Sequence, residues 1–414
     1  MKKNDYAPAK RARISLLFNA NKAYDRQIIE GIGEYFYASQ CDWDIFIEED
    51  FSVHALNADI LSSNGIIADF DDEHLASRLG QIAVPVVGVG GSYRRREDYP
   101  PVSYVATDNE ALVARALHHL IEKGIERFAF FGLPAGAGKR WAQERASAFL
   151  HLTSAMSYPG VVYEGMVTDS NTWETAQQKL AEWLSSLPDH TGIIAVTDAR
   201  ARHILQTCDY LGIAVPERLC VIGIDNEELT RYLSRISLSS VVQGTRKMGF
   251  AAARLLDDRL SGRRVTTEPV IVPPESVIAR QSTDYRSIID AMVVKAMWFI
   301  RKNACRGITV EHVLDAVDTS RSNLDKKFMG ELGTTIHKVI QDAKFARAKE
   351  LLETTTLPVA EISRLCGYST PQYFCTVSRQ NLLMSPVKYR SSLAGGQRSA
   401  ADMRQAGEVQ AEAE

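Results

Sequence analysis

Nine polar or aromatic side chains in this sequence follow predicted strands or lie at a predicted crossing between two lobes. Carboxylate, amide and guanidinium groups are planar, and together they can accept a hydrogen bond from one hydroxyl and donate to its neighbour. An aromatic ring can cover the C–H face of the same molecule. These residue types point to binding of a neutral polyol, such as a sugar. The candidate ligand-binding residues are Tyr24, Asp25, Asp69, Trp141, Arg145, Asp198, Asp225, Asn226 and Gln243.

Several of these candidates also have a purely structural interpretation. Asp25 and Asp69 could be turn or N-cap residues, and Asp198 could cap the helix that follows it. Trp141 could simply pack between domains. Asp225, with its neighbour Asn226, is the strongest candidate, because the pair follows a strand of six apolar or small residues.

The sequence offers little support for catalysis. No nucleophile, oxyanion hole or metal cluster accompanies the aspartates. The segment 132–140 contains Gly-Ala-Gly-Lys-Arg, but it lacks the glycine spacing and the Ser/Thr of a phosphate-binding loop. The glycines of 87–91 fail the dinucleotide fingerprint, and the adjacent His118 and His119 face different directions on a helix. We therefore expect neither enzymatic activity nor a cofactor or metal.

A second group of residues, in the last quarter of the chain, could contact DNA. Two similar segments, 320–328 and 366–374, each follow a short amphipathic helix and a tight turn. A helix-turn-helix unit needs a turn residue that tolerates the left-handed region, and Asp318 and Gly367 meet this need. Two such units in tandem can occupy neighbouring major grooves, so we predict that double-stranded DNA is a partner.

Apolar residues must clamp the two helices of each unit together. In the second unit Ser363 is small where the helices approach. The predicted clamp residues are Val313, Val317, Leu324 and Phe328 in the first unit, and Ile362, Leu365 and Phe374 in the second.

The polar face of each second helix is predicted to meet the DNA. Arginine can bond guanine O6 and N7, asparagine can bond adenine N6 and N7, and Arg379 is placed for a phosphate. The alternative is that these are ordinary helical pairs of an all-α domain. The predicted DNA-binding residues are Ser320, Arg321, Ser322, Asn323, Lys326 and Lys327 in the first unit, and Ser369, Thr370, Gln372, Tyr373 and Arg379 in the second.

The elements that position the first group alternate between strand and helix. The strand runs are short, continuous and β-branched, as parallel strands covered on both faces should be. This rhythm predicts an α/β fold with two lobes, each a doubly wound parallel sheet, followed by an all-α domain. The predicted strands are Ile14–Phe18, Trp43–Ile47, Gly65–Ala68, Val84–Val89, Arg127–Phe131, Ile193–Val196 and Leu219–Ile224.

Charge is distributed unevenly between the two parts of the chain. Residues 284–393 hold 16 Lys or Arg and 11 Asp or Glu, a balance of +5, whereas the whole chain carries −3 and the remainder therefore −8. A basic C-terminal part suits a nucleic-acid-binding module. The predicted domains are a short basic segment 1–13, a ligand-sensing domain 14–283, a DNA-binding domain 284–393 and a disordered tail 394–414.

The composition favours the cytoplasm. No apolar run approaches the length that a bilayer requires, and the basic N-terminus lacks the apolar stretch of a secretion signal. Six scattered cysteines without a Cys-x-x-Cys pair favour reduced thiols over disulfides or zinc.

The C-terminal part resembles the arabinose-regulator (AraC-type) family of transcription factors. The resemblance rests on Ser320–Ser322, Ala348, Gly367–Tyr368 and Tyr389–Arg390, among others. The family usually has a basic residue where Thr376 stands, an aromatic core residue at Ser378 and a turn glycine at Leu383. A buried hydroxyl in place of a ring implies a cavity and an unpaired polar group, each costing roughly 1–3 kcal/mol. We therefore expect a loosely packed second unit, with more of the DNA affinity coming from the first.

The N-terminal part resembles the sugar-binding core of the lactose- and galactose-repressor family. The matching segments include Thr107–Ala111, Ile125–Gly132 and Val221–Asn226. In that family, the residues matching Arg145, Asp198 and Asp225 hold sugar hydroxyls.

The combination of these two parts in one chain, together with segments 18–26 and 225–233, resembles the family of bacterial xylose-operon regulators. This resemblance implies activation of xylose transport and catabolism genes by D-xylose. We also expect a homodimer, with RNA polymerase as a partner. The alternative is a sugar-binding protein or enzyme with an accessory helical domain.

Overall fold

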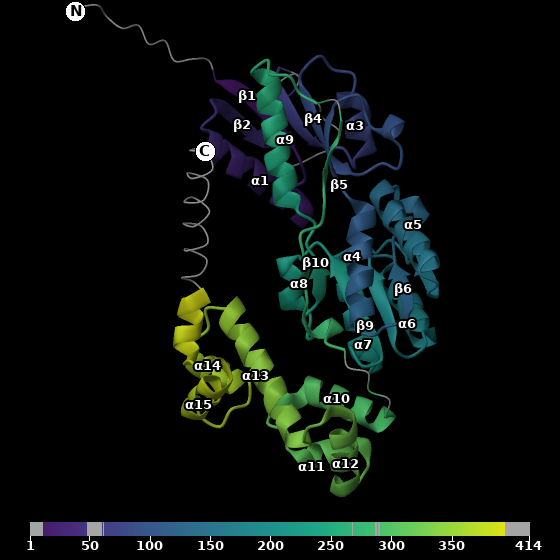
Figure 1. Cartoon of the computed structure of the whole chain (residues 1–414), viewed down its shortest axis with the longest axis vertical. Coiled ribbons are helices and arrows are strands. Elements are labelled where there is room, and N and C mark those ends of the chain that lie inside the picture. Colours follow the sequence, from purple (N-terminus) through teal and green to yellow (C-terminus); the bar gives the residue numbers. More distant parts are fainter. Residues whose placement is uncertain are drawn as a thin grey trace, which may run out of the picture. The chain divides into compact units, whose positions relative to one another are not determined.

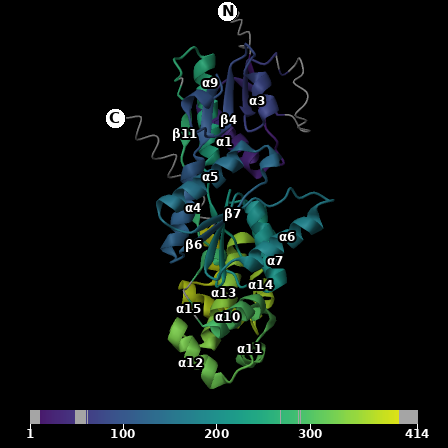
Figure 2. The same cartoon turned by 90° about the vertical axis from the view of Figure 1, so that its right-hand side faces the viewer.

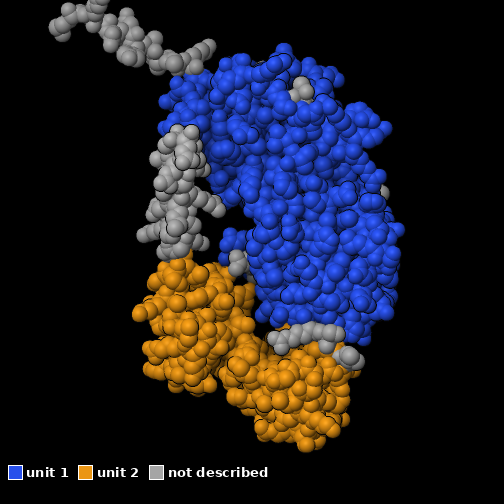
Figure 3. Space-filling model, in the orientation of Figure 1, with its two compact units in different colours: residues 1–286 blue, residues 287–414 orange. Residues whose placement is uncertain are grey.

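The structure is a computed structural model that describes residues 11–47, 60, 62–266, 268–285, 288 and 290–393. The chain divides into two units, residues 1–286 (unit 1) and 287–414 (unit 2), which Figure 3 shows in different colours. Most of the predicted basic segment 1–13 and all of the predicted tail 394–414 lie outside the described residues.

The first lobe of unit 1 is built on a six-stranded parallel sheet with the order β11-β5-β4-β3-β1-β2. Helices α1 (Ala23–Ser39) and α9 (Thr245–Leu260) cover one face of the sheet, and α3 (Glu73–Leu79) packs against the other. The strands are β1 (Ala12–Leu17), β2 (Trp43–Ile47), β3 (Gly65–Asp69), β4 (Val86–Gly91), β5 (Ser103–Thr107) and β11 (Val270–Val272).

The second lobe of unit 1 contains another six-stranded sheet, ordered β12-β10-β9-β8-β6-β7, in which only β12 is antiparallel. Helices α4 (Asn109–Glu122) and α5 (Arg140–Ala155) lie on one face, and α6 (Trp173–Ser186) and α7 (Asp198–Leu211) lie on the other (Figure 2). The strands are β6 (Arg127–Phe131), β7 (Gly160–Tyr163), β8 (Thr191–Ala195), β9 (Leu219–Ile224), β10 (Ser239–Val241) and β12 (Val277–Ile278).

The chain crosses between the two lobes three times (Figure 1). The crossings run from β5 to α4, from β10 to α9 and from β11 to β12. Gln243 lies on the second crossing, as predicted, and Gly244 beside it adopts a left-handed φ of 78°. The Cβ of any other residue at this position would lie 3.1 Å from the Pro273 carbonyl oxygen.

The predicted fold class is confirmed, and each predicted strand is present with shifts of at most two residues at its ends. The prediction omitted β5, β7, β10, β11 and β12. Three of these, β10, β11 and β12, have only two or three residues. Such strands form because their neighbours supply the pairing, and a run this short has no hydrophobic period of its own.

Unit 2 is helical throughout its described part. Its first half packs around Val313, Val317, Leu324 and Phe328, and its second half around Ile362 and Phe374. Residues 386–393 are also helical. The helices are α10 (Ala291–Asn303), α11 (Val310–Val317), α12 (Arg321–Leu332), α13 (Ile336–Thr354), α14 (Val359–Leu365) and α15 (Pro371–Leu382).

Two details of the second helix-turn-helix unit differ from the prediction. Leu365 is 41% exposed, so it does not clamp the helices, and the buried Cys366 and Tyr368 take this role. The Ser378 hydroxyl is buried but not unpaired, because it donates to the Met384 carbonyl at 3.2 Å. The predicted turn residue Asp318 does adopt a left-handed φ of 54°, and Leu383 one of 59°.

Candidate ligand-binding cleft and DNA-binding surface

The candidate ligand-binding residues gather at the carboxyl ends of both sheets. Asp25 lies in the first turn of α1 after β1, Asp69 ends β3, and Asp198 begins α7 after β8. Asp225 and Asn226 follow β9 and are the two candidates that line a pocket of about 530 Å³ between the lobes. Ligands of doubly wound sheets bind at this edge, so the topology places the candidates where a ligand is expected.

A chain of buried polar groups joins the second lobe to the crossings. The Gln243 side-chain amide donates to the Asp225 carboxylate, while its oxygen accepts a bond from Arg145 at 3.0 Å. Arg145 also donates to the Asn109 side chain at 2.9 Å and to the Val196 carbonyl at 2.7 Å. Arg145 and Gln243 are each 3% exposed, so these bonds are shielded from water and hold the side chains in one arrangement.

Electrostatics suit Asp225 to a ligand-binding role. Burial raises the pKa of Asp225 to about 6, against the opposing effects of the Arg145 charge and the Gln243 hydrogen bond. The carboxylate is therefore ionised at neutral pH and accepts hydrogen bonds only. Its backbone φ of 120° and that of Asn226, 50°, are both in the positive region, which non-glycine residues rarely occupy.

Asp198 is held firmly by its neighbours. Its carboxylate oxygens accept from the Ser240 hydroxyl at 2.7 Å and from the Glu227 backbone N–H at 2.8 Å. The suggestion that Asp198 caps α7 is wrong, because Thr197 occupies that position. Glycine is required at position 223, since a Cβ there would lie 2.1 Å from Asp198 Oδ1.

The first lobe contributes two buried carboxylates around Lys22. The ammonium group lies 3.9 Å from Asp25 Oδ2 and 3.4 Å from Asp69 Oδ2. Both carboxylates also accept local hydrogen bonds, Asp25 from the Asn19 N–H and Asp69 from the Asp71 N–H. These bonds agree with the alternative prediction that the two aspartates are turn residues. Tyr24 donates weakly to the Met248 sulfur at 3.9 Å.

Asp25 is incompletely satisfied. Its Oδ1 atom is buried and has no hydrogen-bond partner among the described residues. Burial raises the pKa of Asp25 to about 7, with a further contribution from Asp69, while Lys22 opposes the shift. This oxygen is therefore a buried polar atom that still lacks a partner within the described ranges, beside Lys22 and Asp69.

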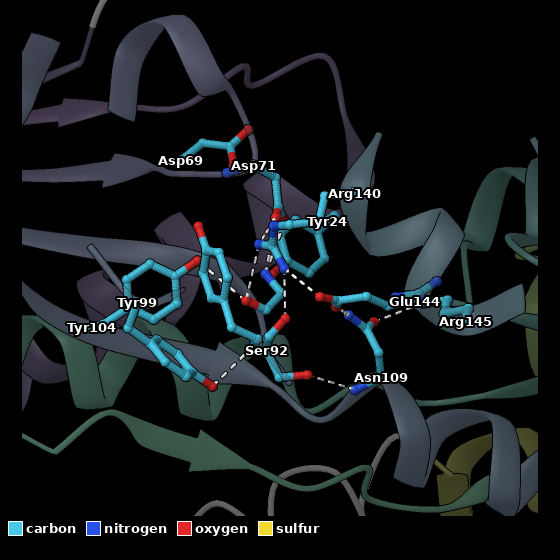
Figure 4. Close-up of polar contacts among 12 residues, drawn as sticks. Tyr24, Asp69, Asp71, Ser92, Tyr99, Tyr104, Asn109, Arg140, Glu144 and Arg145 are labelled. Carbon is cyan, nitrogen blue, oxygen red and sulfur yellow. Dashed lines mark hydrogen bonds and ion pairs between the residues drawn. The ribbon is translucent and has the colours of Figure 1, made fainter. Parts of the chain in front are cut away.

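The sequence interpretation missed a polar network that links the two lobes. Arg140, the first residue of α5, donates to Asp71 at 3.1 Å, to the Gly91 carbonyl at 3.2 Å and to the Ser92 carbonyl at 2.5 Å. It also pairs with Glu144 at 2.8 Å, as Figure 4 shows. Because Arg140 belongs to the second lobe and its other partners to the first, these bonds tie the lobes together.

Trp141 also lies at this junction. The Arg145 guanidinium stands 4.9 Å from the centre of its ring. A Cβ at Gly91 would approach the Trp141 Cβ to 3.2 Å and the Asn109 amide to 2.8 Å. The glycines of β4 therefore permit close packing between lobes, which favours the packing interpretation of Trp141 without preventing contact with a ligand.

Signals for the missed residues were present. Asp71 lies two residues beyond Asp69, at the same strand end. Arg140 belongs to the segment that failed as a phosphate-binding loop, and Asn109 to a segment that carried the family resemblance. The sequence could not show that a side chain of α5 contacts the ends of β3 and β4. These elements belong to different lobes, and their separation along the chain does not reveal how the lobes close.

The first helix-turn-helix unit exposes most of the predicted DNA-binding residues. Ser320 caps α12 by accepting from the Asn323 N–H, and Arg321, Ser322, Asn323 and Lys326 are exposed. Arg321 lies within 3.6 Å of carboxylates of Glu311 and Asp325, so its guanidinium is held near the helix surface.

Lys327 is less available than predicted. Its side chain is 31% exposed and forms an ion pair with Asp290, the N-cap residue of α10. The Asn323 amide donates to the Thr319 hydroxyl at 2.9 Å, although the Asn323 side chain is itself exposed. Arg321 and Lys326 remain the exposed cations of the helix.

The second unit also exposes its predicted residues, Ser369, Thr370, Gln372, Tyr373 and Arg379. Thr370 has a structural role as well, because its hydroxyl caps α15 by accepting from the Tyr373 N–H at 3.1 Å. Because the Ser378 hydroxyl is hydrogen-bonded, an unpaired polar group no longer supports the expectation of a loosely packed second unit. The ranking of the two units stays a prediction, supported by Arg379 being the only basic residue of α15.

Two other kinds of feature are absent from the described ranges. No group of three or more His, Cys, Asp or Glu side chains there is arranged to hold a metal ion. No helix within those ranges is both long enough and apolar enough to cross a membrane.

Known proteins are similar to this chain over most of its length. Three family models match: the XylR N-terminal domain over residues 13–110, the periplasmic binding protein-like domain over 117–283 and a helix-turn-helix domain over 313–392. The xylose operon regulatory protein of Escherichia coli K12 is 57% identical over 381 residues, which cover 92% of this chain and 97% of that protein. The chain belongs to the xylose operon regulatory protein family.

Further relatives support the same assignment. The xylose operon regulatory protein of Haemophilus influenzae is 53% identical over 91% of this chain and 98% of its own. A solved structure described as the xylose-binding transcription activator xylR is 56% identical, with a TM-score of 0.86 over 93% of this chain and 99% of that one. These relatives are named as transcription regulators and not as enzymes. The chain is therefore a DNA-binding transcription regulator with a sugar-binding type of sensor domain.

Proposed function

We propose that this regulator binds D-xylose in the cleft between the lobes of unit 1 and then activates genes for xylose transport and catabolism. The observation that carries the proposal is the buried chain Asp225–Gln243–Arg145 at the carboxyl edge of the second sheet. Asp225 would accept from sugar hydroxyls, and Arg145 would donate to them. The xylose operon relatives, identical at more than half of the aligned positions, support xylose as the sugar.

Groups from both lobes would share the ligand. Asp25 has an unpaired buried oxygen on the first lobe, while Asp225 and Asn226 face the pocket from the second. Asp69, Asp198, Tyr24, Gln243 and Trp141 complete the proposed ligand set. A sugar that satisfies both sides favours the closed arrangement by its difference in affinity for the two states, and the Arg140 bonds strengthen that arrangement.

Closure would control DNA binding by the proposed DNA-binding domain, residues 284–393. We propose that the protein acts in the cytoplasm as a homodimer that recruits RNA polymerase, and that each subunit places α12 and α15 in successive major grooves. The proposed base-reading residues are Arg321 and Asn323, with Lys326 and Arg379 on phosphates. Ser320, Ser322, Lys327, Ser369, Thr370, Gln372 and Tyr373 remain proposed contacts as well.

Sugar specificity is tested by thermal unfolding of the full chain with each of several pentoses. A ligand at about 100 times its Kd stabilises by about 2.7 kcal/mol, which raises Tm by about 5 °C or more. We expect this shift with xylose, its loss in D225A and its retention in the control D44A, which changes an exposed carboxylate on β2. An equal xylose shift in D225A contradicts the proposed site, and no shift in the unaltered protein contradicts xylose as the ligand.

Gating is tested separately by measuring operator affinity at one salt concentration with and without xylose. Salt must be constant because phosphate contacts make the affinity strongly dependent on ionic strength. We expect xylose to tighten binding. Equal affinities in both conditions would rule out gating through DNA binding.

A further inference from the structure

The segment that leads from unit 1 toward unit 2 is bonded to the second lobe by buried side chains. This exit segment, residues 277–285, includes β12 and the 3₁₀ turn Gln281–Thr283. The Ser282 hydroxyl donates to the Val221 carbonyl of β9 at 2.6 Å and accepts from the Ser239 N–H of β10 at 2.8 Å. Ser282 and Thr283 have no exposed surface, so this segment follows any movement of β9 and β10.

A second set of bonds ties the same segment to β10, to α4 and to His190, which precedes β8. The Thr283 hydroxyl lies 2.7 Å from the Ser239 hydroxyl and 2.8 Å from Nε2 of His119 on α4. The Tyr285 hydroxyl lies 2.7 Å from Nδ1 of His190. His119, which cannot chelate a metal with its neighbour, thus has a structural role at the exit from unit 1.

Arg280 connects this segment to the ligand cleft. Its guanidinium donates to Oδ1 of Asn226 at 2.7 Å and to the Leu238 carbonyl at 2.5 Å, and its backbone N–H donates to the Ser239 hydroxyl at 2.7 Å. Asn226 follows Asp225 and lines the cleft pocket. One residue of the exit segment therefore contacts a residue at the edge of the proposed sugar site.

Asn226 also connects to the other cleft carboxylate. Its backbone N–H donates to the Ser240 hydroxyl at 2.9 Å, and that hydroxyl donates to Asp198 at 2.7 Å. Asp225 and Asn226 both have positive φ values, 120° and 50°, a conformation that non-glycine residues rarely adopt and that persists only where the surroundings impose it. A ligand that altered these bonds would remove part of what imposes this conformation.

We propose that Arg280 is a positioning residue that transmits occupation of the sugar site to the segment leading to the DNA-binding unit. The inference rests on the proposed function. A sugar bound to Asp225 replaces or shares the Gln243 bond and shifts the Asp225–Asn226 turn. The Asn226 side chain then moves relative to Arg280, which is anchored to β10 through Leu238 and Ser239. Arg280 itself does not need to touch the sugar.

The test measures two quantities in the full-length protein. One is the Kd for xylose by calorimetry, and the other is the operator Kd with and without saturating xylose at fixed salt. The ratio of the two operator constants is the coupling, which in allosteric proteins is about 5–150-fold. We compare the unaltered protein with R280Q and with the control R264Q, which changes an exposed arginine of the same unit.

In R280Q we expect a xylose Kd within about threefold of the unaltered protein and a coupling ratio that falls to about 1–2. R264Q should keep the full ratio. A full ratio in R280Q overturns the proposal, as does a tenfold loss of xylose affinity with the ratio unchanged, because Arg280 would then act on the sugar site alone.

If R280Q shows no cooperative thermal transition, R280K is measured in the same way. A single ammonium cannot reproduce both guanidinium bonds, so a reduced ratio is expected and a full ratio overturns the proposal. Failure of the proposed function is distinguished by the unaltered protein. There, absence of xylose binding or of coupling refutes that function before Arg280 is considered.

Discussion

At the scale of single residues, the cleft contains buried carboxyl groups whose ionisation is unfavourable. Burial raises the pKa of Asp25 to about 7 and those of Asp71 and Asp225 to about 6. Each folded carboxyl therefore binds a proton up to a higher pH than it does when unfolded. Such groups destabilise the folded state once they ionise. Groups of this kind are common in binding sites, where charged acceptors are needed.

Asp25 provides a test of this cost. Between its ordinary pKa of 3.8 and its folded value of about 7, the folded protein holds a proton that the unfolded chain has lost, so stability falls as pH rises through this window. D25N stays neutral at every pH and avoids the penalty. We expect the Tm advantage of D25N over the unaltered protein to grow by about 3 °C or more from pH 5 to pH 8.

The measurement is thermal unfolding without ligand at several pH values. The control D44N alters an exposed carboxylate of the same lobe and should show a difference that does not depend on pH. A pH-independent difference for D25N as well would mean that the carboxylate is not desolvated as its surroundings suggest.

At the scale of elements, the first lobe depends on the close contact between α1 and α9. A Cβ at Gly31 of α1 would lie 1.9 Å from the Arg246 carbonyl oxygen, and one at Gly249 of α9 would lie 2.0 Å from the Ile28 carbonyl oxygen. The two backbones therefore touch at these positions. Because α9 follows the second crossing and α1 carries Asp25, this contact links the crossing to the first-lobe side of the cleft.

The glycines of α1 offer a matched pair of variants. G31A must push α9 away, since a backbone carbonyl cannot yield as a side chain can, and we expect a loss of about 2 kcal/mol or more. G33A meets nothing within 4 Å and should stabilise the helix by about 0.5–1 kcal/mol. Denaturant unfolding of both variants measures the difference, and a G31A as stable as G33A would show that the helices are not in backbone contact.

At the scale of the whole molecule, the two units have separate hydrophobic cores. Unit 1 packs around its two sheets, and unit 2 has one core on each side of α13. A unit with its own core can fold without the other. Sugar recognition and DNA recognition are therefore separable in principle, and only their coupling requires the intact chain.

Truncation tests this separation. We expect residues 1–286 to bind xylose with a Kd within about threefold of the full chain and to lose all operator binding, and residues 287–414 to bind operator DNA regardless of xylose. The threefold margin is about 0.65 kcal/mol, smaller than the loss of a buried bond. Calorimetry and operator titration give both results. Operator binding retained by 1–286 would place the DNA-binding surface in unit 1 and contradict the proposed DNA-binding domain.

The amino-acid sequence by itself determined the elements and their order. Strands Trp43–Ile47, Arg127–Phe131 and Leu219–Ile224 were predicted to the residue. The hydrophobic period and the turn residues are local properties, so a short stretch of sequence is enough to identify them. The carboxylates at strand ends followed for the same reason, because parallel strands of one sheet present their carboxyl ends at one edge.

Only the tertiary structure decided which side chains meet. Arg140 reaches Asp71, Lys327 pairs with Asp290, Arg280 contacts Asn226, and Leu365 points outward while Cys366 packs. Each pairing joins elements whose separation along the chain carries no information about distance in space. Closure of two lobes and packing of helices set these contacts, and both depend on the shape and volume of the assembled cores rather than on any local pattern.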